Sequence, residues 1–562
     1  MAVRAGLTGR VGRGIAGAAV LIGAITILAR VTGFAKQLAL ARAVGTNCLG
    51  TAYATANMVP NVVFEVVAGG ALAGMVVPVL AAVAARETAE ARAEAGRISS
   101  ALLTWVVLLL VPVGVLTALA AGPVTRLLVG DQVDKCVSGE VVAVATRMLI
   151  VFAPQIPLYG VAVVLYGVLQ AHRRFTGPAL APLVSSVVVI AAYLAFDPLS
   201  GGDRDPATVP GVAEYALSIG TTLGVLSLAV TVIGPTSRLG LRWRPTLRFP
   251  YGVAVQVRRL ALAGLSALVA QQAATAVVIP LANREIGSGG LLVYTYAWAV
   301  YQVPYAVLAV PIATSAFPVL SARAQGHDRA GFAALSAQAA RAIVLISGLA
   351  AGVLAAVAGP VASVFLAGTA SDIPTAQFAR AIALFAPGLV GYGLIAHLSR
   401  VLYASGEGRA AARGMVIGWL AVLVAQAVFV MTFPGDWKLG GLALGQVAGM
   451  TVGGVLLAGS VLRARGGEAL KGLPRAVLAA VAGGCCAFLA GSQAVGGGPW
   501  SGVAGAVFAC VGGVVALVAG ALAVVAVDRG TLGAVLARFD RRAGRAPRGD
   551  RVAAPAEGEE EP

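Results

Sequence analysis

The sequence is poor in charged residues and lacks the arrangements that mark an enzyme or a metal centre. Only 12% of its 562 residues are charged, where a soluble protein of this length would carry roughly a quarter. It has no Walker A loop, no HExxH and no GxSxG motif, and its three histidines and five cysteines show no CxxC or Cys/His spacing. We therefore expect no enzyme, no cofactor and no bound metal.

Apolar residues make up 59% of the chain, and its mean hydropathy is +0.88. Runs of about 20 apolar residues recur along it, and each could cross a bilayer of about 30 Å as a helix. Set against glycine, proline and charge punctuation, the runs predict fourteen helices and hence an all-α polytopic membrane protein. The approximate centres are residues 26, 72, 110, 158, 188, 222, 270, 306, 353, 391, 422, 450, 483 and 514. The first run lacks a typical signal-peptide cleavage site, so we expect it to remain as a helix.

The net charge of +17 comes from basic residues that gather in every second loop. Roughly 30 of the 41 basic residues fall on one side of the predicted membrane and about 8 on the other. The positive-inside rule then predicts that both termini are cytoplasmic. No soluble basic domain is left to hold DNA or RNA, so we expect no nucleic-acid partner. Cys48 and Cys136 fall in loops expected to be external, which leaves a disulfide between them open.

A duplicated segment indicates the architecture most clearly. Residues 147–171 recur as residues 380–404, at a constant offset of 233 positions and without a gap. The matched positions are Arg147 and Arg380, Phe152-Ala153-Pro154 and Phe385-Ala386-Pro387, Tyr159-Gly160 and Tyr392-Gly393, Val168-Leu169 and Val401-Leu402, and Ala171 and Ala404. The copies fall in the fourth and tenth predicted helices, and this even separation makes them parallel repeats, as in many secondary transporters. Arg147 and Arg380 fall at the outer ends of their helices, so we expect the duplicated arginine to anchor at the membrane interface rather than to contact substrate.

The repeat divides the chain into two six-helix lobes and two additional helices. The expected organisation is a cytoplasmic N-terminus at 1–14, an N-lobe of helices one to six at 15–234, a basic cytoplasmic linker at 235–255, a C-lobe of helices seven to twelve at 256–462, helices thirteen and fourteen at 474–527, and a disordered cytoplasmic tail at 528–562. Prolines can bend helices, so the lobes could rock and expose a central cavity to each side in turn.

Polar groups within the predicted membrane helices are the candidates for substrate binding, because they are costly there. Arg30 and Lys36 in the first helix could face a cavity and bind a phosphate group, although Lys36 could instead reach the membrane interface. Asn61 and Glu65 lie in the second helix. Glu65 has three open roles: pairing with Arg30 or Lys36 at the site, binding a coupling proton or cation, or forming a purely structural ion pair. His397 is expected to be a core residue.

Four segments carry a family resemblance. They are Arg30-Val31-Thr32-Gly33-Phe34-Ala35-Lys36; Val59-Pro60-Asn61 with Gly69-Gly70-Ala71 and Val77-Pro78-Val79-Leu80-Ala81; Leu165-Tyr166-Gly167 through Arg174-Phe175 with Pro178-Ala179-Leu180-Ala181-Pro182; and Gln302-Val303-Pro304 to Leu320-Ser321. In this order they resemble the first, second, fourth-to-fifth and eighth helix patterns of the MurJ/MviN family of lipid II flippases. That family lies within the multidrug, oligosaccharidyl-lipid and polysaccharide exporter group, and fourteen helices suit it.

The resemblance implies a flippase that moves lipid II, an undecaprenyl-pyrophosphate-linked peptidoglycan precursor, across the bacterial cytoplasmic membrane. It implies that Arg30 helps to hold the pyrophosphate, while Lys36 keeps only the charge of the family's second arginine. Membrane lipids and cell-wall synthesis proteins are the further partners it suggests. The family's next aspartate is Gln37 here, its arginine pair on helix two is Phe64-Glu65, and its helix-eight Asp-Arg is Trp298-Ala299.

These departures leave other hypotheses open. A site with fewer cations should hold pyrophosphate less strongly. The first alternative is an exporter of another lipid-linked saccharide or of an amphipathic small molecule. The second is a membrane scaffold that keeps the fold without transport.

Overall fold

The computed structural model describes residues 24–25, 28–66, 73–84, 86, 88–249, 253–496 and 502–527, and over these residues it is helical with no strands longer than isolated bridges. Twelve helical spans among them are long and apolar enough to cross a membrane. The helical residues 28–43, and the pair α2 (Cys48–Phe64) and α3 (Ala73–Ala84), add two more. The predicted count of fourteen agrees with this arrangement.

The other elements follow in chain order. Those of the first half are α4 (Ala89–Leu119), α5 (Ala121–Val129), α6 (Ser138–Phe152), α7 (Gln155–Ala171), α8 (Thr176–Ser200) and α9 (Gly211–Ser237). Those of the second half are α10 (Val253–Leu281), η2 (Ala282–Ile286), α11 (Gly290–Pro304), η3 (Tyr305–Ala309), α12 (Val310–Gln325), α13 (Arg329–Ala356), α14 (Ala358–Leu366), α15 (Thr375–Phe385), α16 (Gly388–Ala404), α17 (Gly408–Thr432), η4 (Gly435–Trp437), α18 (Lys438–Arg465), η5 (Gly467–Leu470), α19 (Leu473–Val495) and α20 (Gly502–Val527).

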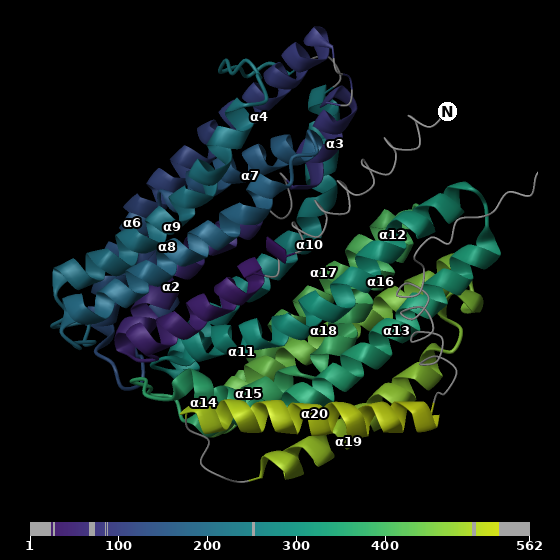
Figure 1. Ribbon diagram of the computed structural model, residues 1–562. Coiled ribbons are helices and arrows are strands. Elements are labelled where there is room, and N and C mark those ends of the chain that lie inside the picture. The colour runs from purple at the N-terminus through teal and green to yellow at the C-terminus, as the bar shows by residue number, and fades with distance from the viewer. Residues whose placement is uncertain are drawn as a thin grey trace, which may run out of the picture.

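The helices form two bundles that meet at one end and spread apart toward the other (Figure 1). The first bundle contains α2 to α9, and the second contains α10 to α18, with α19 and α20 packed along α13. We call them the N-lobe and the C-lobe. Helix α10 packs against α17 in its own lobe and against α3 in the other, so it bridges the two. The loops rich in arginine, among them residues 238–248, lie at the end where the lobes spread.

The span that corresponds to the second predicted helix is centred earlier in the chain than residue 72, because it begins at Cys48 and ends at Ala84. Helix α2 starts at Cys48, where the Asn47 side chain caps it by accepting the Gly50 N–H at 2.9 Å. Thr51 donates its hydroxyl hydrogen back to the Asn47 carbonyl oxygen at 3.0 Å. These polar residues interrupt the apolar pattern without interrupting the helix, because their hydrogen bonds are made within it.

Both copies of the repeat are broken at the same place. Helix α6 ends at Phe152 and α7 begins at Gln155, while α15 ends at Phe385 and α16 begins at Gly388. A proline lies in each gap; it has no N–H to donate and its ring clashes with the carbonyl four residues before it. The fourth helix of each lobe is therefore two helical segments joined at a bend.

The duplicated Tyr-Gly pair has a shared packing role. A side chain at Gly160 would collide with Val106 and Leu110 of α4, and one at Gly393 with Ile343 of α13. Helices α4 and α13 are the third spans of their lobes. Each glycine thus lets the fourth span pack closely on the third.

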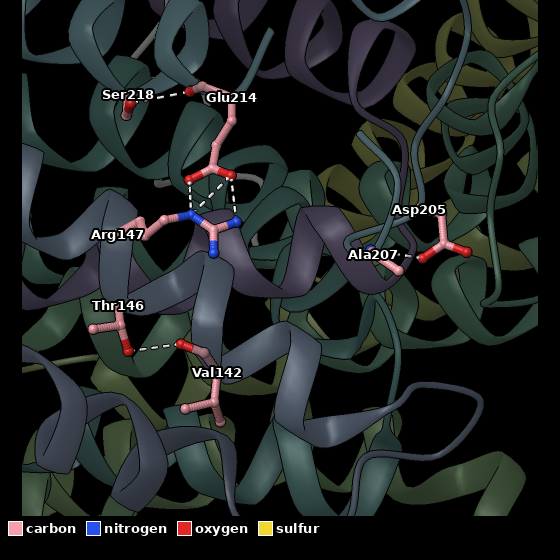
Figure 2. Close-up of polar contacts among 7 residues, drawn as sticks. All are labelled: Val142, Thr146, Arg147, Asp205, Ala207, Glu214 and Ser218. Carbon is pink, nitrogen blue, oxygen red and sulfur yellow. Dashed lines mark hydrogen bonds and ion pairs between the residues drawn. The ribbon is translucent and has the colours of Figure 1, made fainter. Parts of the chain in front are cut away.

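The duplicated arginines anchor the fourth span of each lobe to the start of the sixth. Arg147 Nε and Nη2 donate to the two carboxylate oxygens of Glu214, at 2.9 and 2.6 Å (Figure 2). Arg380 Nη1 donates to the Asp436 carbonyl oxygen at 2.7 Å, and its guanidinium lies 4.0 Å from the Trp437 ring centroid. Both side chains thus join helices within their own lobe, a role that the sequence analysis did not assign, while anchoring at the membrane interface stays a prediction.

The loop between α8 and α9 is ordered by its own aspartates. The Asp205 N–H donates to the Asp203 carboxylate at 2.9 Å. The Ala207 N–H donates to the Asp205 carboxylate at 3.0 Å (Figure 2). The first of these bonds, with help from the Thr208 hydroxyl, lowers the pKa of Asp203. The predicted termini at 1–14 and 528–562 lie outside the described residues.

The packing of the fourth spans predicts the effect of enlarging their glycines. Gly393→Val should place methyl groups against α13 and destabilise the protein by about 1–3 kcal/mol, as overpacked cores do. The melting temperature of the detergent-solubilised protein should fall by several degrees, and Gly160→Val should act in the same way. Gly459→Val in α18 is the matched control, because nothing lies within 4 Å of a side chain added there. Equal melting of all three variants would contradict this account.

Candidate functional site

The two lobes are joined at one end by a set of side-chain and backbone hydrogen bonds that we call the latch. It consists of Thr46 and Lys135 from the N-lobe, and Ser288, Ser371 and Asp372 from the C-lobe. The Thr46 hydroxyl donates to the Ser371 hydroxyl at 2.6 Å. Backbone bonds flank this contact, because the Thr46 N–H donates to the Ala370 carbonyl and the Asp372 N–H donates to the Thr46 carbonyl, both at 2.9 Å.

Asp372 is the residue on which the latch converges. Its carboxylate accepts the Ser288 hydroxyl at 2.6 Å, and its carbonyl oxygen accepts the Lys135 ammonium at 3.1 Å. Hydrogen bonds to charged groups are worth about 1.5–3 kcal/mol each. The Asp372 backbone thus bonds to the N-lobe, while its carboxylate joins Ser288 to the loop after α14 within the C-lobe.

A second layer of bonds lies just inside the latch. Asn283 of η2 donates from its amide nitrogen to Thr55 at 2.9 Å and to the Leu128 carbonyl at 3.0 Å. The Gly289 N–H donates to the Thr51 hydroxyl at 2.8 Å. Gly289 has a φ of +76°, which favours glycine, and a side chain there would collide with Thr46. The C-lobe segment 283–289 is therefore fitted closely against α2.

Cys48 and Cys136 form a disulfide, with their Cα atoms 5.7 Å apart. It joins the start of α2 to the loop before α6, so both cysteines belong to the N-lobe. The neighbouring residues Thr46 and Lys135 are the N-lobe half of the latch. The pairing that the sequence left open is thus present in the structure, beside the contacts that join the lobes.

The four residues proposed from sequence lie on or beside the surfaces where the lobes face each other. Arg30 is exposed and Lys36 is half-buried on the first helix, which touches the C-lobe where the Phe34 and Phe365 rings meet at 5.3 Å. Asn61 accepts the Tyr159 hydroxyl at 3.2 Å. Glu65 forms no ion pair with Arg30 or Lys36 among the described residues, so the predicted pairing is absent here.

Glu65 instead interacts electrostatically with both copies of the duplicated tyrosine, Tyr159 of its own lobe and Tyr392 of the opposite lobe. The Phe64 ring packs against Tyr159 at 4.2 Å between centroids. Tyr392 thus comes near the N-lobe, which the sequence analysis did not anticipate, whereas the hydrogen-bond and ring partners of Tyr159 lie within its own lobe.

Aromatic side chains of the C-lobe gather around Tyr392. We call Trp298, Tyr301, Tyr305 and Tyr392 the aromatic cluster. Tyr305 stacks on Tyr392 at 4.0 Å between centroids, and Trp298 lies 5.2 Å from Tyr301. Tyr305 begins the π-helical turn η3, a local widening that is often found at functional sites.

Arg400 is a cation near the C-terminal end of α16, and the sequence analysis did not identify it as a candidate. It lies two turns beyond Tyr392 on the same helix, and it interacts electrostatically with Tyr305 and Tyr403. It is half-buried, its Nη1 donates to the Ala396 carbonyl, and no acidic side chain pairs with it among the described residues. His397, one turn earlier, is fully buried, and its Nε2 lies 3.1 Å from the Ser336 carbonyl, as expected for a core histidine.

The latch predicts how one substitution would change the conformational equilibrium. Thr46→Val keeps the size of the side chain but removes its hydrogen bond to Ser371 across the lobes, which is worth about 0.5–1.5 kcal/mol. Because about 1.4 kcal/mol is a tenfold change in an equilibrium constant, we expect the population with separated latch halves to rise about two- to tenfold. Pulsed EPR between labels at Gln132→Cys and Ala376→Cys would measure it, with Cys485, Cys486 and Cys510 replaced by alanine.

Asp436→Ala is the matched control for this experiment. Its carboxylate accepts Gln377 at 3.1 Å, and both residues belong to the C-lobe. An equal change of the distance distribution in both variants would show that Thr46 has no special part in joining the lobes.

Comparison with known proteins shows which family this chain resembles. The family model described as "Lipid II flippase MurJ" matches residues 40–507. The "Lipid II flippase MurJ" of Burkholderia cenocepacia is 28% identical over 390 residues, which cover 68% of this chain and 72% of that protein. The "Probable lipid II flippase MurJ" of Synechocystis sp. is 25% identical over 246 residues, 44% of each chain.

Solved structures give the same fold. A structure of lipid II flippase MurJ in an inward closed conformation has a TM-score of 0.69 at 18% identity and covers 90% of this chain and 98% of its own. An inward-facing MATE family transporter of the MOP superfamily has a TM-score of 0.62 at 16% identity, covering 79% of this chain and 98% of its own. With its family model matched over most of its length, the chain belongs to the lipid II flippase MurJ family.

Proposed function

We propose that this protein translocates lipid II across the bacterial cytoplasmic membrane by alternating access. The family match over residues 40–507 is the observation that carries the proposal. The architecture supports it, because two parallel-repeat lobes are joined by hydrogen bonds at one end and spread apart at the other (Figure 1). We propose that the segments 15–234 and 256–462 move as the two bodies, with α19 and α20 as an addition to the second.

We propose that the latch faces the cell exterior and that both termini are cytoplasmic. The arginine-rich loops lie at the opposite end from the latch, as the positive-inside rule expects of cytoplasmic loops. The Cys48–Cys136 disulfide supports the same orientation, since disulfides persist in oxidising compartments outside the cytoplasm. The structure then corresponds to a state closed to the exterior.

Arg30, Lys36 and Arg400 are the cations that we propose hold the pyrophosphate. Each lies within or at the end of a membrane helix without an acidic partner among the described residues. Arginine presents a planar fork that matches phosphate oxygens, whereas lysine offers a point charge. Asn61 and Glu65 would line the same region from α2, with Glu65 available to bind a coupling proton or cation.

Several cationic residues of the family pattern are replaced in this chain, so we also consider a second candidate function. Glu65 and Trp298 occupy positions where the family pattern has arginine or an Asp-Arg pair, and both lie between the lobes in the structure. An exporter of another lipid-linked saccharide, or of an amphipathic small molecule, would suit fewer cations. A scaffold without transport activity is the third candidate, and cell-wall synthesis proteins are the partners it would bring together.

Complementation tests the main proposal. A host depleted of its own lipid II flippase should grow when this chain is expressed, because translocated precursor would again reach the outer leaflet. Insertion and amount would be checked by membrane fractionation. Absence of rescue by a well-inserted protein would remove lipid II as the substrate, and movement of a labelled lipid in vesicles would exclude the scaffold.

Transport by arginine variants tests the proposed cation site. Arg30→Ala should abolish transport of labelled lipid in proteoliposomes, and Arg400→Ala should lower it at least tenfold, because each removes a charge that faces the pyrophosphate. Arg400→Lys should recover part of the rate. Arg409→Ala, which removes an exposed arginine at the start of α17, is the control. Wild-type rates in both test variants would remove these residues from the mechanism.

A further inference from the structure

We propose that Trp298, Tyr305 and Tyr392 form a saccharide-binding surface that holds the sugar rings of the transported headgroup by stacking. This inference rests on the proposed function and adds to it a subsite for the uncharged part of the substrate. It assigns a role to the aromatic cluster, which the pyrophosphate-binding cations leave unexplained.

The aromatic cluster has a base of fully buried rings and a front of three rings that are partly accessible. Tyr301 and Phe385 are fully buried, and their ring centroids are 5.4 Å apart. Trp298, Tyr305 and Tyr392 lie over this base and are only partly buried. The base fixes the orientation of the front rings, whose remaining surface is available to a ligand.

The front of the cluster faces the opposite lobe rather than lipid. Tyr392 interacts electrostatically with Glu65, which belongs to α2 of the N-lobe. Tyr305 stacks on Tyr392 with an angle of 21° between the ring planes. Both rings therefore lie on the side of the C-lobe that is nearest to Glu65. A molecule that enters between the lobes would meet these rings.

Polar groups are interleaved with the rings. The Gln302 amide lies two residues before Pro304 on the same helical segment as Trp298 and Tyr305, and the Tyr305 and Tyr392 rings bring their hydroxyl groups to the same stack. On the facing lobe, Asn61 and Tyr159 form a further donor–acceptor pair at 3.2 Å. Apolar rings combined with a few placed polar groups are the usual composition of a site for a neutral polar ligand.

A pyranose ring matches this composition. The face of an aromatic ring carries negative charge density, and the C–H bonds on one face of a sugar carry positive partial charge. The sugar's hydroxyl groups leave from its edge, where amide and phenol groups can donate and accept. An acyl chain would leave those polar groups unpaired, so the interleaved pattern disfavours it.

The test measures saccharide binding separately from transport. The full-length protein in nanodiscs would be mixed with the soluble disaccharide-peptide headgroup of lipid II, and saturation-transfer NMR would detect contact with the sugar C–H protons. We expect transfer to the wild type and a loss of at least fivefold in Trp298→Ala and in Tyr392→Ala. Tyr392→Phe should retain transfer, because the ring remains. Tyr215→Ala, which removes a tyrosine that is 51% exposed on α9, is the control.

Each outcome decides between the two proposals. Transfer that depends on the rings, in a protein that fails to move lipid II in vesicles, would keep the saccharide surface and remove lipid II transport. Lipid II movement without transfer to the wild type, or with transfer unchanged in both alanine variants, would overturn the saccharide surface. Ring-dependent transfer from tetraphenylphosphonium but none from the disaccharide would overturn it as well, and would assign the rings and Glu65 to an organic cation. Melting temperatures of all variants would show that the proteins are folded.

Discussion

The joining of the lobes depends on hydrogen bonds that cross between them at one end, backed by a shared apolar core. The Thr46 hydroxyl bonds to Ser371, and the backbone groups of Thr46 bond to Ala370 and Asp372. Beside these bonds, one apolar cluster runs through both lobes and includes Tyr53 and Phe152 of the first and Leu292 and Phe385 of the second. Buried apolar surface resists separation in proportion to its area, while each hydrogen bond contributes about 0.5–1.5 kcal/mol. Separation of the lobes at this end would therefore expose part of this cluster as well as break the bonds of the latch.

The duplicated segment explains why the two bodies are alike. In each lobe a proline breaks the fourth span, a glycine brings it close to the third, and an arginine fastens it to the start of the sixth. The tyrosine beside each glycine interacts electrostatically with Glu65, Tyr159 from the same lobe and Tyr392 from the other. The segment that builds the scaffold thus also brings two related side chains near one acidic residue.

The sequence predicted the scaffold well and the site less well, for a physical reason. Helix number and the parallel repeat follow from hydropathy and spacing, which are local properties of the chain. The contacts of the duplicated arginines and the latch could not be predicted, because their partners, such as Glu214 for Arg147 and Ser371 for Thr46, are far away in the sequence. Arg400 was missed since it lies near a helix end, where an arginine usually marks the interface. The duplicated tyrosine was visible, but only the fold shows that Tyr392 comes near Glu65 of the other lobe.

The disulfide has a consequence for repeated turnover. Because Cys48 and Cys136 belong to one lobe, the covalent bond never spans the surface that must open and close. It can remain oxidised through every cycle, so no reductant is needed for movement. The N-lobe side of the latch then presents the same rigid template each time the halves meet again, and re-closure requires only the C-lobe loops to find their partners.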